Sequence, residues 1–125
     1  MHKDSNAINW FEIPVTNFER AKKFYETIFG IQMHSQNMNG YMMGFFPSYT
    51  GKASGAIIHG EDCVPSKNGT MVYLNSNPDM TPIINKVETA GGKIIMPKTQ
   101  ITPELGFQAV IIDTEGNKVA LHSQK

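Results

Sequence analysis

The sequence contains very little cysteine and no long apolar segment. Cys63 is the single cysteine, so no internal disulfide can form, and a reducing cytoplasm is the expected location. No apolar run approaches the roughly 20 residues that are needed to cross a bilayer. Residues 1–6 are mostly polar and lack the apolar stretch of a secretory signal. We therefore expect a cytoplasmic protein that has no membrane partner.

An excess of charge of either sign is also absent. The 11 lysines and arginines balance the 11 aspartates and glutamates, and charges of both signs are interspersed. This pattern lacks the basic footprint that nucleic acids and anionic membranes require. We therefore expect no nucleic-acid partner, and a small molecule or a second copy of the chain remains. With 125 residues, the chain has the size of one domain, residues 1–125.

The first half of the chain has the pattern of a strand, a capped helix and three more strands. Ile8 to Val15 alternates bulky groups, and Pro14 near its end cannot donate a ladder hydrogen bond. Thr16 and Glu19 form a capping box that predicts the start of a helix, and Gly30 predicts its left-handed end. The three further strands are expected at residues 31–36, 40–46 and 54–59.

The second half repeats this order after a polar linker at residues 61–69, which is rich in proline, glycine and asparagine. A strand at 70–75 precedes a helix at 77–92, which we expect Ser76 or Asn77 to cap and Pro78 to begin. Strands are then expected at residues 93–97, 107–113 and 118–123, and a tight turn through Gly116 joins the last two. The chain therefore encodes the same unit twice.

The duplicated order predicts an α+β fold made of two tandem βαβββ modules. Module one spans residues 6–62 and module two spans residues 70–125, with the linker at 61–69 between them. Each module has one helix and four short strands, which are too few to cover both faces of its sheet. We therefore expect the modules to share a core, and their curved mixed sheets to enclose a shared cavity. Such a cavity is a common place for a ligand.

Four segments carry a resemblance to a known superfamily. They are Phe11-Glu12-Ile13-Pro14-Val15, Ala21-Lys22-Lys23-Phe24-Tyr25 followed by Gly30, Ala90-Gly91-Gly92-Lys93, and Asp113-Thr114-Glu115-Gly116-Asn117. With this pattern from Ile8 to Ser123, the chain resembles the vicinal oxygen chelate superfamily, which includes glyoxalase I, bleomycin-resistance proteins and extradiol dioxygenases. The resemblance implies the two-module fold and a homodimer. It leaves the activity open, since members include lyases, dioxygenases and proteins that only sequester a ligand.

The resemblance also implies four positions for ligands of a divalent metal. These positions fall at Trp10, near Ile57 to His59, near Met71 and at Ser123. Only His59 among them could coordinate a metal well, because an indole nitrogen offers no lone pair, a thioether is too soft, and serine is a poor neutral ligand. A catalytic zinc needs three protein ligands. We therefore predict no metal cofactor, with a divalent metal as the alternative.

Glu12 and His59 are the candidate catalytic residues. Strand alternation places Glu12 on the same face as Trp10, where the resemblance puts the cavity. Burial there would raise the pKa of the Glu12 carboxyl and suit a general base, whereas the alternative is a glutamate in solvent or paired with a lysine. His59 could be a metal ligand, a base, or a polar residue at a strand end. His122 should face away from the cavity and serve packing or hydrogen bonding.

Side chains on the same strand faces are the expected lining of the cavity. The predicted ligand-binding set is Trp10, Glu12, Met43, Phe45, Met71, Tyr73, Phe107 and Ser123. A shift of one residue in a strand would move all of its side chains to the other face.

Three functions are compatible with this interpretation. The first is a glyoxalase-like or bleomycin-resistance-like protein that binds a small organic molecule in an apolar cavity without a metal. The second is a metal-dependent lyase or dioxygenase with atypical ligands, built from Glu12, His59 and His122. The third is a dimeric interaction module whose pocket is vestigial. We expect the first, in a homodimer, and the sequence leaves open whether a reaction is catalysed.

Overall fold

The chain forms the element order that its sequence predicts, a strand, a helix and three strands, twice. In the computed structural model, which describes residues 1–125, these elements are β1 (Trp10–Pro14), α1 (Phe18–Phe29), β2 (His34–Met38), β3 (Tyr41–Phe45), β4 (Ser54–His59), β5 (Tyr73–Asn75), α2 (Thr81–Val87), β6 (Lys93–Thr102), β7 (Gly106–Ile112) and β8 (Lys118–Ser123). Residues 60–72, between β4 and β5, contain no helix or strand. Neither helix has the length and apolar character that a membrane crossing requires.

Each module contributes one four-stranded mixed sheet, and the two sheets have the same topology. Sheet 1 has the order β1-β4-β3-β2, and sheet 2 has the order β5-β8-β7-β6. In both sheets the first strand of the module pairs in parallel with the last one, and all other pairs are antiparallel. The predicted α+β fold of two βαβββ modules is therefore confirmed.

Helix α1 has a different N-cap from the predicted one. Asn17, not Thr16, is the cap, and its Oδ1 accepts the N–H of Arg20 at 3.1 Å. The predicted capping box at Thr16 does not form. The N–H groups of Thr16 and Asn17 instead both donate to Glu115, a residue of the other module. Such a distant acceptor has no local signal in the sequence. The predicted left-handed end at Gly30 is confirmed by its φ of 63°.

Helix α2 is shorter than predicted, because the chain before it is held by other contacts. The Ser76 hydroxyl donates to a carbonyl of β5, and Asn77 Oδ1 accepts the N–H of Gln124 at 2.8 Å. Neither residue therefore caps the helix. Pro82 lies in the first turn in place of the predicted Pro78.

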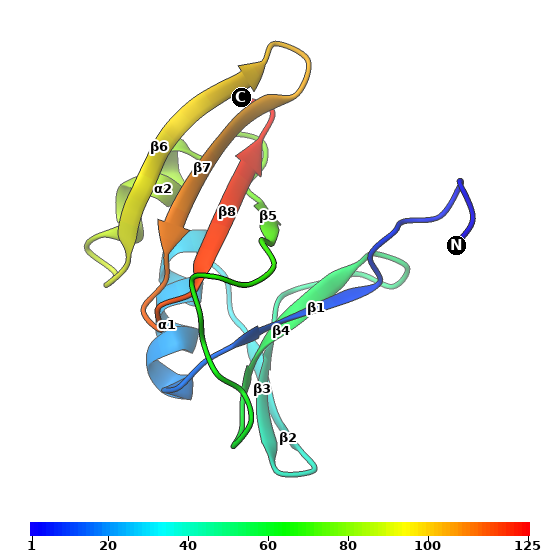
Figure 1. Ribbon diagram of the computed structural model, residues 1–125, viewed down its shortest axis with the longest axis vertical. Helices are drawn as coiled ribbons and strands as arrows, with labels where there is room; N and C mark the ends of the chain where they lie inside the picture. The colour runs from blue at the N-terminus through cyan, green and yellow to red at the C-terminus, as the bar shows by residue number, and fades with distance from the viewer.

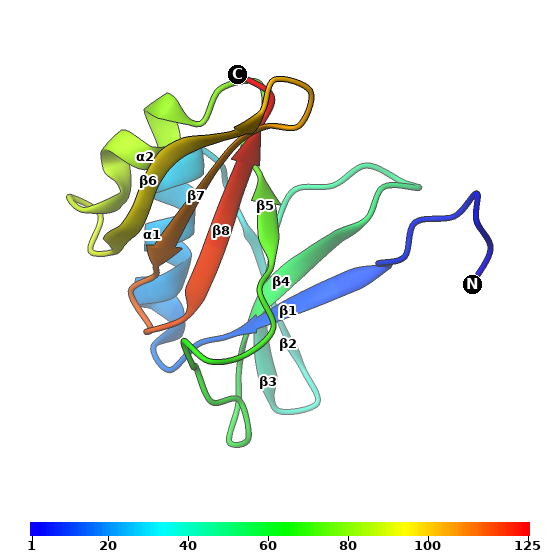
Figure 2. The ribbon, with the colours of Figure 1, turned by 45° about the horizontal axis from the view of Figure 1, so that its top comes forward.

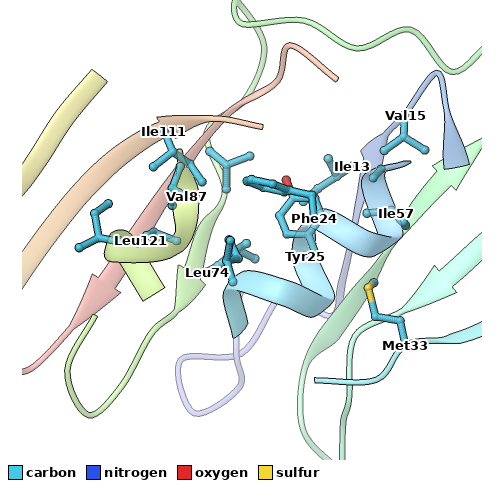
Figure 3. Packing of buried hydrophobic residues seen from close by; sticks show 14 of the residues in the cluster. Ile13, Val15, Phe24, Tyr25, Met33, Ile57, Leu74, Val87, Ile111 and Leu121 are labelled. Atoms are coloured by element: carbon cyan, nitrogen blue, oxygen red, sulfur yellow. The ribbon is translucent and has the colours of Figure 1, made fainter. Parts of the chain in front are cut away.

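The shared core lies on the helix side of both sheets. Figure 3 shows Phe24 and Tyr25 of α1 near Leu74 of β5, with Ile13 and Ile57 of sheet 1 also in the cluster. Removing these apolar side chains from water is the main driving force for folding. Because side chains of both modules contribute to one cluster, the modules stabilise each other.

The sheets do not close around a shared cavity, so this part of the sequence prediction is wrong. Figures 1 and 2 show the two sheets diverging from one another and not stacked face to face. The physical reason is that the core occupies the helix side of both sheets, which leaves their other faces directed outward. We call these outward faces open face 1, on sheet 1, and open face 2, on sheet 2.

A polar junction fixes module two against module one. It is formed by the turn Asp113–Asn117, between β7 and β8. The Tyr25 hydroxyl donates to Asp113 Oδ2 at 2.7 Å, and the Asn117 amide donates to the carbonyl of Pro14 at 2.7 Å. Burial and the nearby Asp113 charge raise the pKa of Tyr25 well above its ordinary value, so the hydroxyl keeps its proton. Leaving such a buried group unpaired costs about 1–3 kcal/mol, so the junction resists separation of the modules.

Glu115, in the same turn, is the acidic partner of the N-terminus of α1. Its side chain is 0% exposed and accepts hydrogen bonds from Arg20 Nε and from the N–H of Asn17, both at 2.7 Å. The carboxylate also faces the positive end of the helix dipole. Burial alone would raise the pKa of Glu115, but the hydrogen bonds from Arg20 and Asn17 outweigh it and lower the pKa from 4.5 to about 2. Glu115 is therefore ionised at neutral pH.

We expect Glu115→Gln to lower the free energy of unfolding by about 1–3 kcal/mol near neutral pH, because it removes the charge from the hydrogen bonds that Glu115 accepts from Arg20, Thr16 and Asn17. Chemical denaturation followed by circular dichroism measures this difference. Because the folded-state pKa is depressed, the advantage of the wild type is complete above pH 4.5 and disappears as the pH falls toward about 2. Glu104→Gln, at an exposed position, is the control. An equal loss of stability in both variants would contradict this role of Glu115.

Candidate functional site

Open face 1 is defined by the alternation of side chains along the strands of sheet 1. Ile13 and Ile57 are paired and buried in the core, so Glu12 and Ala56, which are also paired, point to the other side. The same register continues across β3 and β2. The residues of open face 1 are Trp10, Glu12, Pro14, His34, Gln36, Met38, Tyr41, Met43, Phe45, Ser54, Ala56 and Ile58.

Three rings on open face 1 form a line across the sheet, which we call the aromatic row. It consists of Trp10, Phe45 and His34. The ring centroids of Trp10 and Phe45 are 6.0 Å apart with the planes at 54°, and those of Phe45 and His34 are 6.2 Å apart with the planes at 22°. Trp10 is 45% exposed. The row therefore presents ring surfaces to solvent, against which a flat organic molecule can pack.

The structure brings four of the predicted ligand-binding residues onto one face. Trp10, Glu12, Met43 and Phe45 all lie on open face 1, and Trp10 Nε1–H donates to Glu12 Oε2 at 3.4 Å. Glu12 itself is exposed, so the burial that would favour a general base is absent in a single chain. Binding of a ligand by these four residues stays a prediction.

His59 does not join Glu12. It follows Ile58 on β4, so alternation places it on the helix side of sheet 1, opposite to Glu12. Its Nδ1 lies 3.1 Å from the carbonyl of Val15, and the ring is exposed at the end of the strand. The two candidate catalytic residues therefore lie on opposite faces of the sheet. The position of His59 matches the alternative of a polar strand-end residue.

Open face 2 is defined in the same way. Leu74 and Leu121 are paired and buried, so their neighbours Tyr73 and Ala120, which are also paired, point outward. Tyr73 is 54% exposed, and its hydroxyl donates to Gln108 at 3.5 Å. The residues of open face 2 on β5, β7 and β8 are Tyr73, Asn75, Gln108, Val110, Ile112, Lys118, Ala120 and His122.

Ser123 and Phe107, two of the predicted ligand-binding residues, face the helix side of sheet 2. Ser123 is fully buried, and its Oγ accepts the N–H of Met80 at 3.1 Å. Phe107 is paired with Ser123, and the ammonium of Lys98 lies 4.6 Å from its ring centroid. Their side chains therefore lie one residue of alternation away from open face 2, and binding of a ligand by them stays a prediction.

His122, and not its neighbour Ser123, lies on open face 2, although the sequence prediction directed His122 away from the cavity. Its Nε2 is 2.6 Å from the carbonyl of Leu105. The signal was present in the alternating apolar residues Val119 and Leu121, which are both buried and therefore place His122 outward. Met71 precedes β5 and is half-buried, outside the strand in which it was predicted.

The histidine, cysteine and acidic side chains do not gather into a metal site within one chain. No group of three or more lies close enough to hold a metal ion. Open face 1 carries Glu12 and His34, and open face 2 carries His122. Because a catalytic zinc needs three protein ligands, the donor set of a single chain does not fit a catalytic metal. The absence of a metal cofactor stays a prediction.

Two hollows lie beside β1, and neither contains the aromatic row. The smaller, of about 360 Å³, is lined by Glu12 and Lys118 among others, under the chain segment 64–72. The larger, of about 710 Å³, is lined by Phe11 and Phe46 on the helix side of sheet 1. None of the three rings of the aromatic row lines either hollow. A single chain therefore presents this row as an open surface.

Solved structures share this fold. TnmS3, an antibiotic binding protein from Streptomyces sp. CB03234, matches with a TM-score of 0.68 and 20% identity, over 99% of this chain and 100% of that one. Glyoxalase I from Zea mays matches with a TM-score of 0.70 and 18% identity, over 93% of this chain. The chain spans only 45% of the maize enzyme. At these identities the likeness shows the fold alone.

Sequence comparisons extend the assignment from fold to family. A glyoxylase-like domain-containing protein from Didymella fabae is 30% identical over 119 residues, which cover 91% of each chain. The family model described as the Glyoxalase/Bleomycin resistance protein/Dioxygenase superfamily matches residues 7–121. With nearly the whole chain matched, this protein belongs to the Glyoxalase/Bleomycin resistance protein/Dioxygenase superfamily.

Proposed function

We propose that the protein binds a flat organic molecule on the aromatic row, without a bound metal, in a site that a second copy of the chain completes. The observation that carries this proposal is the row itself. Trp10 is 45% exposed and packs against Phe45, which packs against His34. Large apolar side chains gathered at the surface mark binding sites. An aromatic ligand would bury these rings and gain both hydrophobic and stacking energy.

Two further residues of open face 1 support a ligand in this place. Glu12 uses one carboxylate oxygen for Trp10, at 3.4 Å, so its other oxygen is free to accept a hydrogen bond from a ligand. Met43 is buried on the same face, and its flexible thioether can adjust the surface beneath ligands of different shape. TnmS3, which has the same fold, is described as an antibiotic binding protein, a precedent for an organic ligand.

The role of a second copy follows from the direction of the two open faces. The polar junction holds the modules so that these faces diverge, and one chain cannot enclose a ligand between them. On open face 2 the side chain of Tyr73 is 54% exposed, and Ile95 on β6 is exposed to the same extent. A two-fold dimer would place open face 1 of each copy against open face 2 of the other. Each site would then combine Trp10 and Phe45 with the partner's Tyr73.

A metal-dependent lyase or dioxygenase is the second candidate function. The observation in its favour is that Glu12, His34 and His122 all lie on open faces. The same dimer would bring Glu12 of one copy toward the partner's His122, whereas His34 lies at the opposite edge of sheet 1 from Glu12. This carboxylate and imidazole would supply two of the three protein ligands that a catalytic metal needs. His59 is not part of this set, because it lies on the helix side of β4.

Trp10 is the only tryptophan, so its fluorescence reports on the aromatic row alone. We expect quinoline, added to protein treated with a chelator, to change the Trp10 emission with saturation. Phe45→Ala should weaken this binding roughly three- to tenfold, because an aromatic contact is lost. Tyr49→Ala, which removes an 86% exposed ring outside the row, should leave the affinity unchanged. A change without saturation, or equal weakening by both variants, would contradict the proposed site.

Titration calorimetry with zinc, nickel, manganese and iron(II) separates the two candidate functions. For the metal-free binding protein we expect no stoichiometric uptake, because one chain offers no cluster of three suitable ligands. Uptake of one metal per site, abolished by Glu12→Gln or His122→Ala and unaffected by His59→Ala, would instead establish the metal-dependent enzyme.

A further inference from the structure

The larger hollow is a second candidate binding site that is separate from the aromatic row. It lies where the β3–β4 loop, the end of α1 and the start of module two meet, and its volume of about 710 Å³ is within the range of small-molecule sites. In Figure 2 the β3–β4 loop and β5 lie on the two sides of the gap between the sheets. Phe11 and Phe46 place the hollow on the helix side of sheet 1, so it does not depend on the proposed function.

The floor of this hollow is apolar and only partly covered. The rings of Phe11 and Phe46 pack together with centroids 5.6 Å apart. Ile31, just after α1, and Ile83, in α2, complete the floor. All of these residues pack against the buried core and are themselves half-buried. The core therefore continues to the surface here, and an apolar molecule would extend it.

The rim of the hollow carries hydrogen-bond donors and one positive charge. Lys52 is the only charged residue among its 14 lining residues, and it makes no ion pair. Asn75 and Asn77 use their side-chain oxygens to accept the backbone N–H groups of Asn77 and Gln124, at 3.0 and 2.8 Å. Their amide NH₂ groups stay free to donate. No carboxylate lines the hollow, so its polar rim suits an anion.

We propose that this hollow binds a small molecule that has an apolar body and a single carboxylate. The apolar body would cover the floor of Phe11, Phe46 and Ile83, and the carboxylate would pair with Lys52 at the rim. A cationic molecule of the same shape would meet the Lys52 charge without any acidic residue to compensate it. The charge of Lys52 therefore makes the hollow prefer apolar molecules that carry a carboxylate over those that carry an amine.

Three compounds with the same phenylbutyl body test the proposal: 4-phenylbutyrate, 4-phenylbutylamine and 4-phenylbutanol. Each is titrated into the full-length, ¹⁵N-labelled protein, and amide shifts report both affinity and position. We expect 4-phenylbutyrate to shift residues 29–31, 46–53 and 74–83, and to bind roughly fivefold more tightly than the amine, the value of one exposed ion pair. The alcohol should fall between them.

Variants assign the preference and the position separately. Lys52→Met should make the three affinities equal. The control is Lys23→Met, which changes an exposed lysine of α1 outside the hollow and should leave the preference for the acid unchanged. Ala53→Phe and Ile83→Trp fill the hollow from two sides and should weaken the binding of all three compounds. The proposal is overturned if the amine binds as tightly as the acid, if the preference persists in Lys52→Met, or if shifts occur only on open face 1. Shifts of the same residues with protein concentration alone would instead assign the hollow to a second copy.

Discussion

The polar junction between the turn Asp113–Asn117 and helix α1 is the constraint on which the rest of the structure depends. Its hydrogen bonds are buried or charge-assisted, so they have a defined geometry and are costly to break. They hold the end of β1 and the start of α1 against the start of β8. The apolar core then fills the space on the helix side of both sheets. As a consequence, both sheets turn their other faces outward.

This arrangement separates the two apolar surfaces that remain available for binding. Open face 1 carries the aromatic row of Trp10, Phe45 and His34, with Glu12 as its carboxylate. The larger hollow lies on the opposite side of the same sheet and has Lys52 as its only charged residue. The two places differ in charge and in shape, so they would select different molecules. Open face 1 lacks a cover in a single chain, whereas the hollow is formed by both modules of one chain.

Local signals in the sequence are sufficient for the elements and for most of one open face. Ile13 on β1 and Val15 just after it are apolar and alternate with Glu12 and Pro14, so the sequence places Trp10 and Glu12 on the other side, as the structure does. On β8, the same rule applied to Val119 and Leu121 indicates His122, but the superfamily pattern directed the prediction to Ser123. The acceptor of the Thr16 and Asn17 N–H groups and the divergence of the sheets have no local signal. Both depend on the turn that contains Glu115, which is 98 residues from Asn17.

Sedimentation equilibrium of the full chain tests most directly whether the diverging open faces require a second copy. We expect the wild type to sediment with twice the mass of one chain at micromolar concentrations. Tyr73→Lys, which places a charge on an exposed position of open face 2, should sediment as a monomer with an unchanged circular dichroism spectrum. A wild type that stays monomeric as its concentration rises, or a dimer that Tyr73→Lys leaves intact, would contradict a site built from open faces 1 and 2.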